Sequence, residues 1–130
     1  MFLHEIESCI ATRQDFAFET TLAGRVYFKL IDRLQANGWL VELIYLALPS
    51  AEMSRLRVAE RVAHGGHNIP EADIARRFPR SLHNLLNVFA PKIDQTLCFM
   101  NSGAIPELVF QQTGTAREIS HADLFSLLQQ

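Results

Sequence analysis

Trp39-Leu40-Val41-Glu42-Leu43-Ile44-Tyr45-Leu46-Ala47-Leu48 is the stretch that decides the fold. Its apolar residues follow one another almost without alternation, which is typical of a strand buried on both faces of a parallel sheet. Pro49 and Ser50 end the strand, and Ser50 is placed to cap a helix over residues 51–64. The stretch therefore predicts a central strand followed by a crossover helix.

Working outward, the pattern predicts helices alternating with strands. Apolar residues at helical spacing or in short runs predict helices over 2–13, 22–35, 51–64, 70–77, 80–89 and 122–128, and strands over 16–18, 39–48, 96–100, 108–111 and 117–119. We expect a helix break or kink at Pro79 and a hairpin near Thr113-Gly114. This order predicts a single α/β domain, a three-layer sandwich with a mostly parallel sheet.

Composition limits the class of protein. The 130 residues suit one domain, and 48% hydrophobic against 20% charged residues indicates a folded globular chain. No apolar run reaches the roughly 20 residues that span a bilayer, and no signal peptide is evident, so we expect a cytoplasmic protein without a membrane partner. Cys9 and Cys98 have no metal-ligand spacing, so both are expected to be reduced and buried.

Positive charge is concentrated in one segment. The chain carries a net charge of -2, yet six arginines and only three acids lie between Arg55 and Arg80. A local rather than general excess argues against a nucleic-acid partner. Arginine suits bidentate contact with phosphate, and Gly65-Gly66 provides a hinge, so residues 63–80 resemble the lid of a phosphoryl-transfer enzyme.

Plainer interpretations of the same segment remain open. The arginines can instead form a solvated helix face, pairing with Glu60, Glu71 and Asp73 at helical spacing. His64 and His67 flank the glycines, but two histidines without a third ligand make a weak metal site, so we predict no metal ligands.

Polar residues follow three of the predicted strands. They are Glu19-Thr20-Thr21, Pro49-Ser50 and Asn101-Ser102. Ligands of open parallel sheets bind at the carboxyl ends of the strands. The carboxylate and two hydroxyls of the first cluster suit magnesium held through water, an acceptor hydroxyl or a catalytic base, whereas the alternative is a threonine helix cap.

Several of these stretches together resemble a known family. These stretches are Phe16-Ala17-Phe18-Glu19-Thr20-Thr21-Leu22-Ala23-Gly24, Leu43 to Ser50, Arg57-Val58 with Glu60-Arg61-Val62, Gly65 to Pro70, Arg76 to Leu82 and Asn101-Ser102. Their order and spacing are similar to those of the zeta-toxin-like P-loop kinases, also described as predicted ABC-type ATPases. The resemblance covers roughly residues 10–105.

The resemblance implies a P-loop nucleoside-triphosphatase fold that uses ATP and Mg²⁺ to phosphorylate a small-molecule hydroxyl, with an antitoxin as a partner by analogy. Residue by residue, it places Glu19, Thr20 and Thr21 on the acceptor side, and Asn101 beside adenine. Arg61, Arg76, Arg77 and Arg80 become lid residues on the ATP phosphates, and Glu19 and Arg77 become the catalytic candidates.

One departure limits the resemblance. A Gly-x-x-x-x-Gly-Lys-Ser/Thr loop supplies the phosphate cradle of such kinases, and no Gly-Lys pair occurs in this sequence. We therefore expect the carboxyl-terminal part of a P-loop kinase-like domain, incomplete at its N-terminus and inactive without a P-loop. The alternative is a non-enzymatic remnant or interaction module. In either case we expect an open sheet edge that pairs with a second copy or with a chain supplying the P-loop. The alternative is that residues 16–18 pair with the strand over 39–48 and close the sheet.

Overall fold

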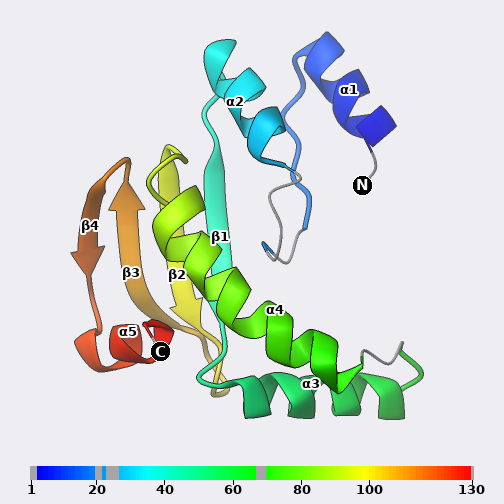
Figure 1. Cartoon of the computed structure of the whole chain (residues 1–130). Coiled ribbons are helices and arrows are strands. Elements are labelled where there is room, and N and C mark those ends of the chain that lie inside the picture. Colours follow the sequence, from blue (N-terminus) through cyan, green and yellow to red (C-terminus); the bar gives the residue numbers. More distant parts are fainter. Residues whose placement is uncertain (1–2, 20–21, 23–26, 67–69, 130) are drawn as a thin grey trace.

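The computed structural model describes residues 3–19, 22, 27–66 and 70–129, which form an α/β arrangement around one sheet (Figure 1). The helices are α1 (Leu3–Thr12), α2 (Phe28–Ala36), α3 (Ala51–Ala63), α4 (Glu71–Asn84), the π-helix η1 (Leu85–Phe89) and α5 (Ala122–Leu128). The strands are β1 (Glu42–Ala47), β2 (Gln95–Met100), β3 (Glu107–Thr113) and β4 (Ala116–Ile119).

The sheet is mixed, with strand order β1-β2-β3-β4. Strands β1 and β2 are parallel, whereas β2–β3 and β3–β4 are antiparallel. The prediction of a mostly parallel sheet is therefore wrong. A parallel connection needs a dozen or more residues, and α3 and α4 provide it between β1 and β2. Residues 101–106 are too few for a second crossover, while the predicted hairpin is confirmed, with Gly114 at φ +58° in its turn.

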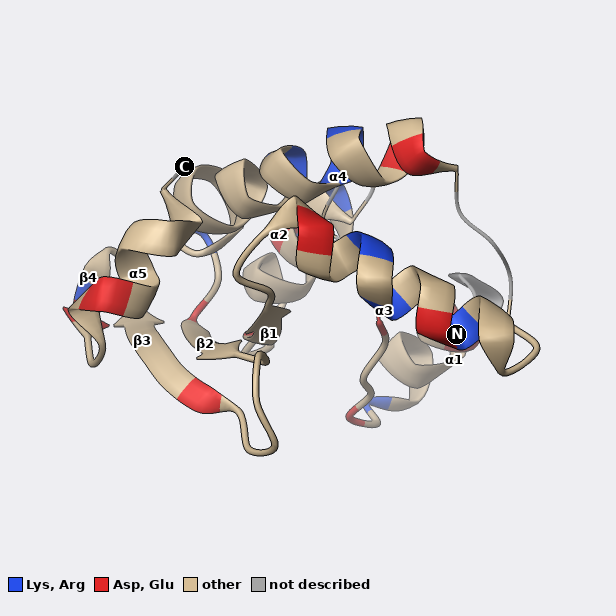
Figure 2. Cartoon of the chain, turned by 90° about the horizontal axis from the view of Figure 1, so that it is seen from below, with Lys and Arg blue, Asp and Glu red and all other residues tan. Residues whose placement is uncertain are grey.

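The helices α4 and α5 lie on the same side of the sheet (Figure 2). Leu85 and Phe89 of η1 and Phe125 of α5 belong to one core cluster with Cys98 and Phe110 of the sheet. On the opposite face, 65% of Ile44 and 56% of Leu46 remain exposed. The described residues thus form a helical layer on a sheet, and the predicted third layer is not found among them.

Strand β1 forms one edge of this sheet rather than its centre. Its residues alternate between exposed and half-buried up to Ala47, which is buried. The prediction of burial on both faces is therefore wrong, because β1 has a single strand neighbour and one covered face among the described residues. Its apolar sequence leaves an open, apolar edge.

The predicted strand at Phe16–Phe18 is also absent, since residues 14–19 have no regular structure. The rings pack instead: Phe16 lies 5.8 Å from Trp39 and Phe18 lies 4.6 Å from Tyr27, centroid to centroid. Three apolar residues without a neighbouring strand in register gain more from aromatic packing than from extended backbone.

Two predicted helix boundaries are wrong, although α1 confirms the predicted helix over 2–13. The second helix begins at Phe28 and not at Leu22, because Leu22 adopts a left-handed backbone with φ +57°. The break expected at Pro79 is absent, and α4 runs through this residue to Asn84. Buried Ile74 and Leu82 anchor α4 on both sides of the proline.

Candidate functional site

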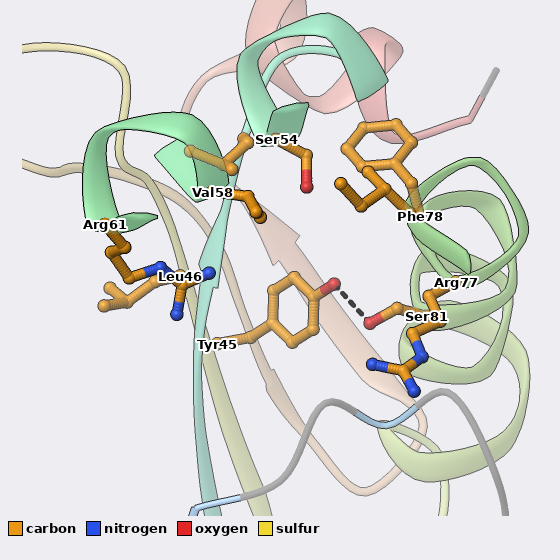
Figure 3. Close-up of a pocket in the computed structure, with 10 residues that line it drawn as sticks. Tyr45, Leu46, Ser54, Val58, Arg61, Arg77, Phe78 and Ser81 are labelled. Carbon is orange, nitrogen blue, oxygen red and sulfur yellow. Dashed lines mark hydrogen bonds between the residues drawn. The ribbon is translucent and has the colours of Figure 1, made fainter. Parts of the chain in front are cut away.

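A pocket of about 200 Å³ lies beside the carboxyl end of β1, between this strand and the helices α3 and α4 (Figure 3). Its lining consists of Tyr45, Leu46, Leu48, Ser54, Val58, Arg61, Ile74, Arg77, Phe78 and Ser81. Apolar side chains therefore form much of the wall, while three hydroxyls and two guanidinium groups supply its polar atoms.

Helix α3 begins where the sequence predicts. The Ser50 hydroxyl accepts a hydrogen bond from the Met53 amide at 3.2 Å, which caps the helix directly after β1. Val58 is buried, and Arg61 lies three residues further along α3. Arg77 enters the same pocket from α4, so the two guanidinium groups come from different helices (Figure 3).

Gly65 and Gly66 end α3 in a Schellman motif. The Gly66 amide donates to the Arg61 carbonyl at 2.7 Å, the Gly65 amide donates to the Val62 carbonyl at 3.0 Å, and Gly65 has φ +90°. A Cβ on Gly66 would lie 2.8 Å from the Arg61 carbonyl oxygen. The pair predicted as a hinge therefore also acts as a helix cap built around Arg61.

The arginines of this segment divide into two groups. Arg55 pairs with Glu52 at 2.8 Å, Arg57 with Glu60 at 3.9 Å and Arg76 with Asp73 at 2.8 Å. Arg55 and Arg76 fit the interpretation as a solvated, ion-paired helix face, whereas the Nε of Arg57 is buried without a hydrogen-bond partner among the described residues. Arg61, Arg77 and Arg80 form no ion pair within 4.0 Å in the part of the chain that the structure describes.

Tyr45 and Ser81 share a hydrogen bond of 2.7 Å between their hydroxyl oxygens, within the pocket (Figure 3). Burial raises the pKa of the Tyr45 phenol, and the hydrogen bond between Tyr45 and Ser81 partly opposes that shift. The phenol therefore stays protonated at neutral pH and keeps a proton to donate. Sequence reasoning missed both residues, although a lone hydroxyl within an apolar strand was a usable signal.

The structure brings together only some of the predicted site residues. Arg61 and Arg77 line the pocket, whereas Arg76 and Arg80 are exposed and do not. The Asn101 amide donates to the Ala47 carbonyl at 2.7 Å, which places Asn101 where β1 and β2 end. Glu19 is exposed outside the pocket lining, and the predicted residues Thr20 and Thr21 lie outside the described residues.

The guanidinium groups of Arg61 and Arg77 fit a phosphate group, because their side chains are exposed and have no ion-pair partner among the described residues. The described residues contain no group of three or more His, Cys, Asp or Glu side chains that could hold a metal ion. The donors that these residues offer thus suit an anion and do not by themselves make a magnesium site.

Among the described helices, none is long and apolar enough to cross a bilayer.

The parallel pair β1–β2 and its helical crossover define an α/β protein, with a pocket that two arginines line beside the carboxyl end of β1. The family model of the zeta toxins, described as "Zeta toxin", matches residues 4–102. The chain belongs to the zeta toxin family, which confirms the resemblance found in the sequence and indicates a kinase-like P-loop fold.

An uncharacterized protein of Haemophilus influenzae (strain ATCC 51907 / DSM 11121 / KW20 / Rd) is 32% identical over 63 residues. The match covers 48% of this chain and 45% of the relative, so it spans about half of each. No solved structure matches the chain.

Proposed function

We propose that this chain carries the lid and acceptor side of a zeta-toxin-like, ATP-dependent small-molecule kinase. The observation that carries the proposal is that Arg61 and Arg77 line one pocket from two different helices, and that neither has an ion-pair partner among the residues that the structure describes. Phosphoryl transfer relies on positioning and on neutralising charge, and guanidinium groups that line one pocket supply positive charge for this.

Each predicted residue has a role in this proposal. Arg61 and Arg77 hold phosphate oxygens, and Arg76 and Arg80 add positive charge on the same lid. Asn101 contacts the adenine side, while Glu19 accepts the proton of the acceptor hydroxyl, with Thr20 and Thr21 orienting that hydroxyl. Tyr45 and Ser81 hold polar atoms of the ligand inside the pocket. ATP supplies the transferred phosphoryl group, with Mg²⁺ as its counterion.

The proposed kinase needs a phosphate cradle, and residues 1–130 contain no Gly-Lys pair. We therefore propose that this chain alone does not turn over ATP, and that a P-loop must come from further polypeptide. A cytoplasmic location and an antitoxin partner are part of the same proposal, and family membership supports them by analogy.

Pyrophosphate is the direct probe of the arginine pair. We expect binding with a dissociation constant of about 1 mM, followed by NMR, with the largest amide shifts around Arg61 and Arg77. Arg77→Ala should weaken binding by about fivefold, or about 1 kcal/mol, as for a partly solvated charge-assisted contact. Arg55→Ala is the matched control, because Arg55 lies on α3, pairs with Glu52 and does not line the pocket. Equal loss in both variants would refute a site at Arg77.

The second candidate function is an interaction module that pairs through β1. The supporting observation is that β1, with exposed Ile44 and Leu46, has one strand neighbour among the described residues. A groove of about 760 Å³ follows this edge and is walled on its other side by Phe16 and Phe18. Such an edge is suited to pair with another strand, from a second copy or from a chain that supplies the P-loop.

Light scattering at micromolar concentration tests this module. We expect association that Ile44→Glu weakens while the monomer stays folded by circular dichroism. Ile105→Glu is the control, because Ile105 is 79% exposed but lies outside the strands. A strictly monomeric wild-type chain would exclude self-association through this edge.

A further inference from the structure

Asn84, the last residue of α4, reaches a distant part of the chain. Its side chain is buried, with 4% exposed, and its Nδ2 donates to the Leu22 carbonyl at 2.6 Å. A buried amide requires its hydrogen bonds, so this contact fixes the distance between α4 and Leu22.

Leu22 adopts a backbone conformation that a leucine rarely takes. Its φ of +57° lies in the left-handed region, where the side chain crowds the backbone, so the surroundings must hold it. Two described contacts contribute: the side chain is 5% exposed within the core cluster, and the carbonyl accepts from Asn84. Burial of the side chain restricts where Leu22 lies, whereas the hydrogen bond from Asn84 also restricts the direction in which the Leu22 carbonyl points.

The location of this bond links two parts of the candidate site. Asn84 follows Arg77 by seven residues on α4, and Leu22 follows Glu19 by three residues in the sequence. Directly after Asn84 the helix widens into η1, and such π-helical turns are frequent at functional sites. One hydrogen bond thus joins the lid helix to the stretch that carries the proposed acceptor-side carboxylate.

We propose that Asn84 is a positioning residue, which holds Leu22 in its left-handed conformation so that the Glu19 stretch and the Arg77 helix keep one fixed arrangement. The inference rests on the proposed phosphate role of Arg77 for its functional part. Its structural part, the dependence of Leu22 on Asn84, stands without that role.

NMR on the 130-residue chain separates the two parts. We expect a scalar coupling across the hydrogen bond between Asn84 Nδ2 and the Leu22 carbonyl carbon in the wild type. In Asn84→Ala, the Leu22 backbone ¹³C shifts should leave the left-handed range. The matched control is Asn87→Ala, because the Asn87 side chain also donates to a helix carbonyl, that of His83 at 3.1 Å, but is exposed.

Titration with pyrophosphate supplies the functional readout. In the wild type and in Asn87→Ala, the amides of Arg77, Glu19 and Leu22 should shift together. In Asn84→Ala, Arg77 should still respond, with a dissociation constant within about twofold, as expected for a distant uncharged site, while Glu19 and Leu22 should not. A role in stability alone would leave all three responses intact.

The outcomes are distinguishable. Left-handed shifts of Leu22 that persist in Asn84→Ala, or shared responses that persist there, would overturn the positioning role. If Asn84→Ala does not fold, absence of the cross-bond coupling in the wild type would overturn it and its presence would support it. Failure of the wild type to bind pyrophosphate would refute the proposed function, whereas the Leu22 shifts would still test Asn84.

Discussion

Arg117 of β4 joins four elements of the fold, and its replacement provides a quantitative test. Its Nε donates to Gln112 Oε1 at 2.7 Å, and its Nη2 donates to the Leu86 carbonyl of η1 at 2.9 Å. The guanidinium lies 5.2 Å from the centre of the Phe110 ring and 5.5 Å from that of Phe125. The charge is therefore held by β3, η1 and α5 together.

Arg117→Met keeps much of the side-chain volume and removes all polar contacts. Two hydrogen bonds from a charged donor contribute about 1.5 kcal/mol each at a half-buried site, and the aromatic contacts add about 0.5–1 kcal/mol. We expect the free energy of unfolding to fall by about 3–4 kcal/mol. Arg117→Lys keeps the charge and one donor, so about half of this loss is expected.

Urea unfolding followed by circular dichroism measures these losses as a lower midpoint at an unchanged slope. Arg33→Met is the control, because Arg33 pairs with Glu7 at 2.9 Å on the surface and should contribute less than about 1 kcal/mol. A loss below about 1 kcal/mol in Arg117→Met would refute the assigned role, since it would equal that of a surface ion pair.

Three further predictions follow from local geometry. Cys98 is buried and burial raises its pKa to about 12, so a thiol reagent at pH 8 should modify half-buried Cys9 well before Cys98 until the chain unfolds; equal rates would contradict this. Gly66→Ala should lower stability by more than about 1 kcal/mol in urea unfolding, because its Cβ would meet the Arg61 carbonyl, and a neutral result would exclude the cap. Burial raises the folded-state pKa of Tyr45 above 10.0, so the contribution of the protonated phenol to the free energy of unfolding is full below pH 10 and is lost as pH rises through the folded pKa. Tyr45→Phe should therefore flatten the decline of stability at high pH, as measured in a pH series of melts.

The sequence predicted those elements whose signals are local. The helix after Ser50 was placed correctly because a hydroxyl cap stands directly before it, and the hairpin because Gly114 supplies the positive φ that its turn needs. Both signals act over a few residues, so no knowledge of the rest of the chain is required.

The wrong predictions depend on contacts across the fold. The apolar stretch at β1 has the composition of a central strand, yet whether its edge is open depends on which strands lie beside it. Continuation of α4 through Pro79 depends on burial of the residues around it, which outweighs one lost backbone bond. Leu22 was predicted to begin a helix because residues 22–35 follow a helical apolar pattern, and that local pattern contains no sign of its contact with the distant Asn84.

The candidate site could be predicted from the sequence only in part. Arg55, Arg57 and Arg76 each have an acid three residues away, and these are the arginines that the structure pairs. Arg61, Arg77 and Arg80 have no acid at that spacing. Neighbours three and four residues apart both meet on a helix surface, and Asp73 lies four residues before Arg77. Sequence spacing therefore separates Arg61 and Arg80 from acidic neighbours, but it does not separate Arg77. That Arg61 and Arg77 line one pocket with Tyr45 and Ser81 depends on the packing of α4 against β1, which no local pattern contains.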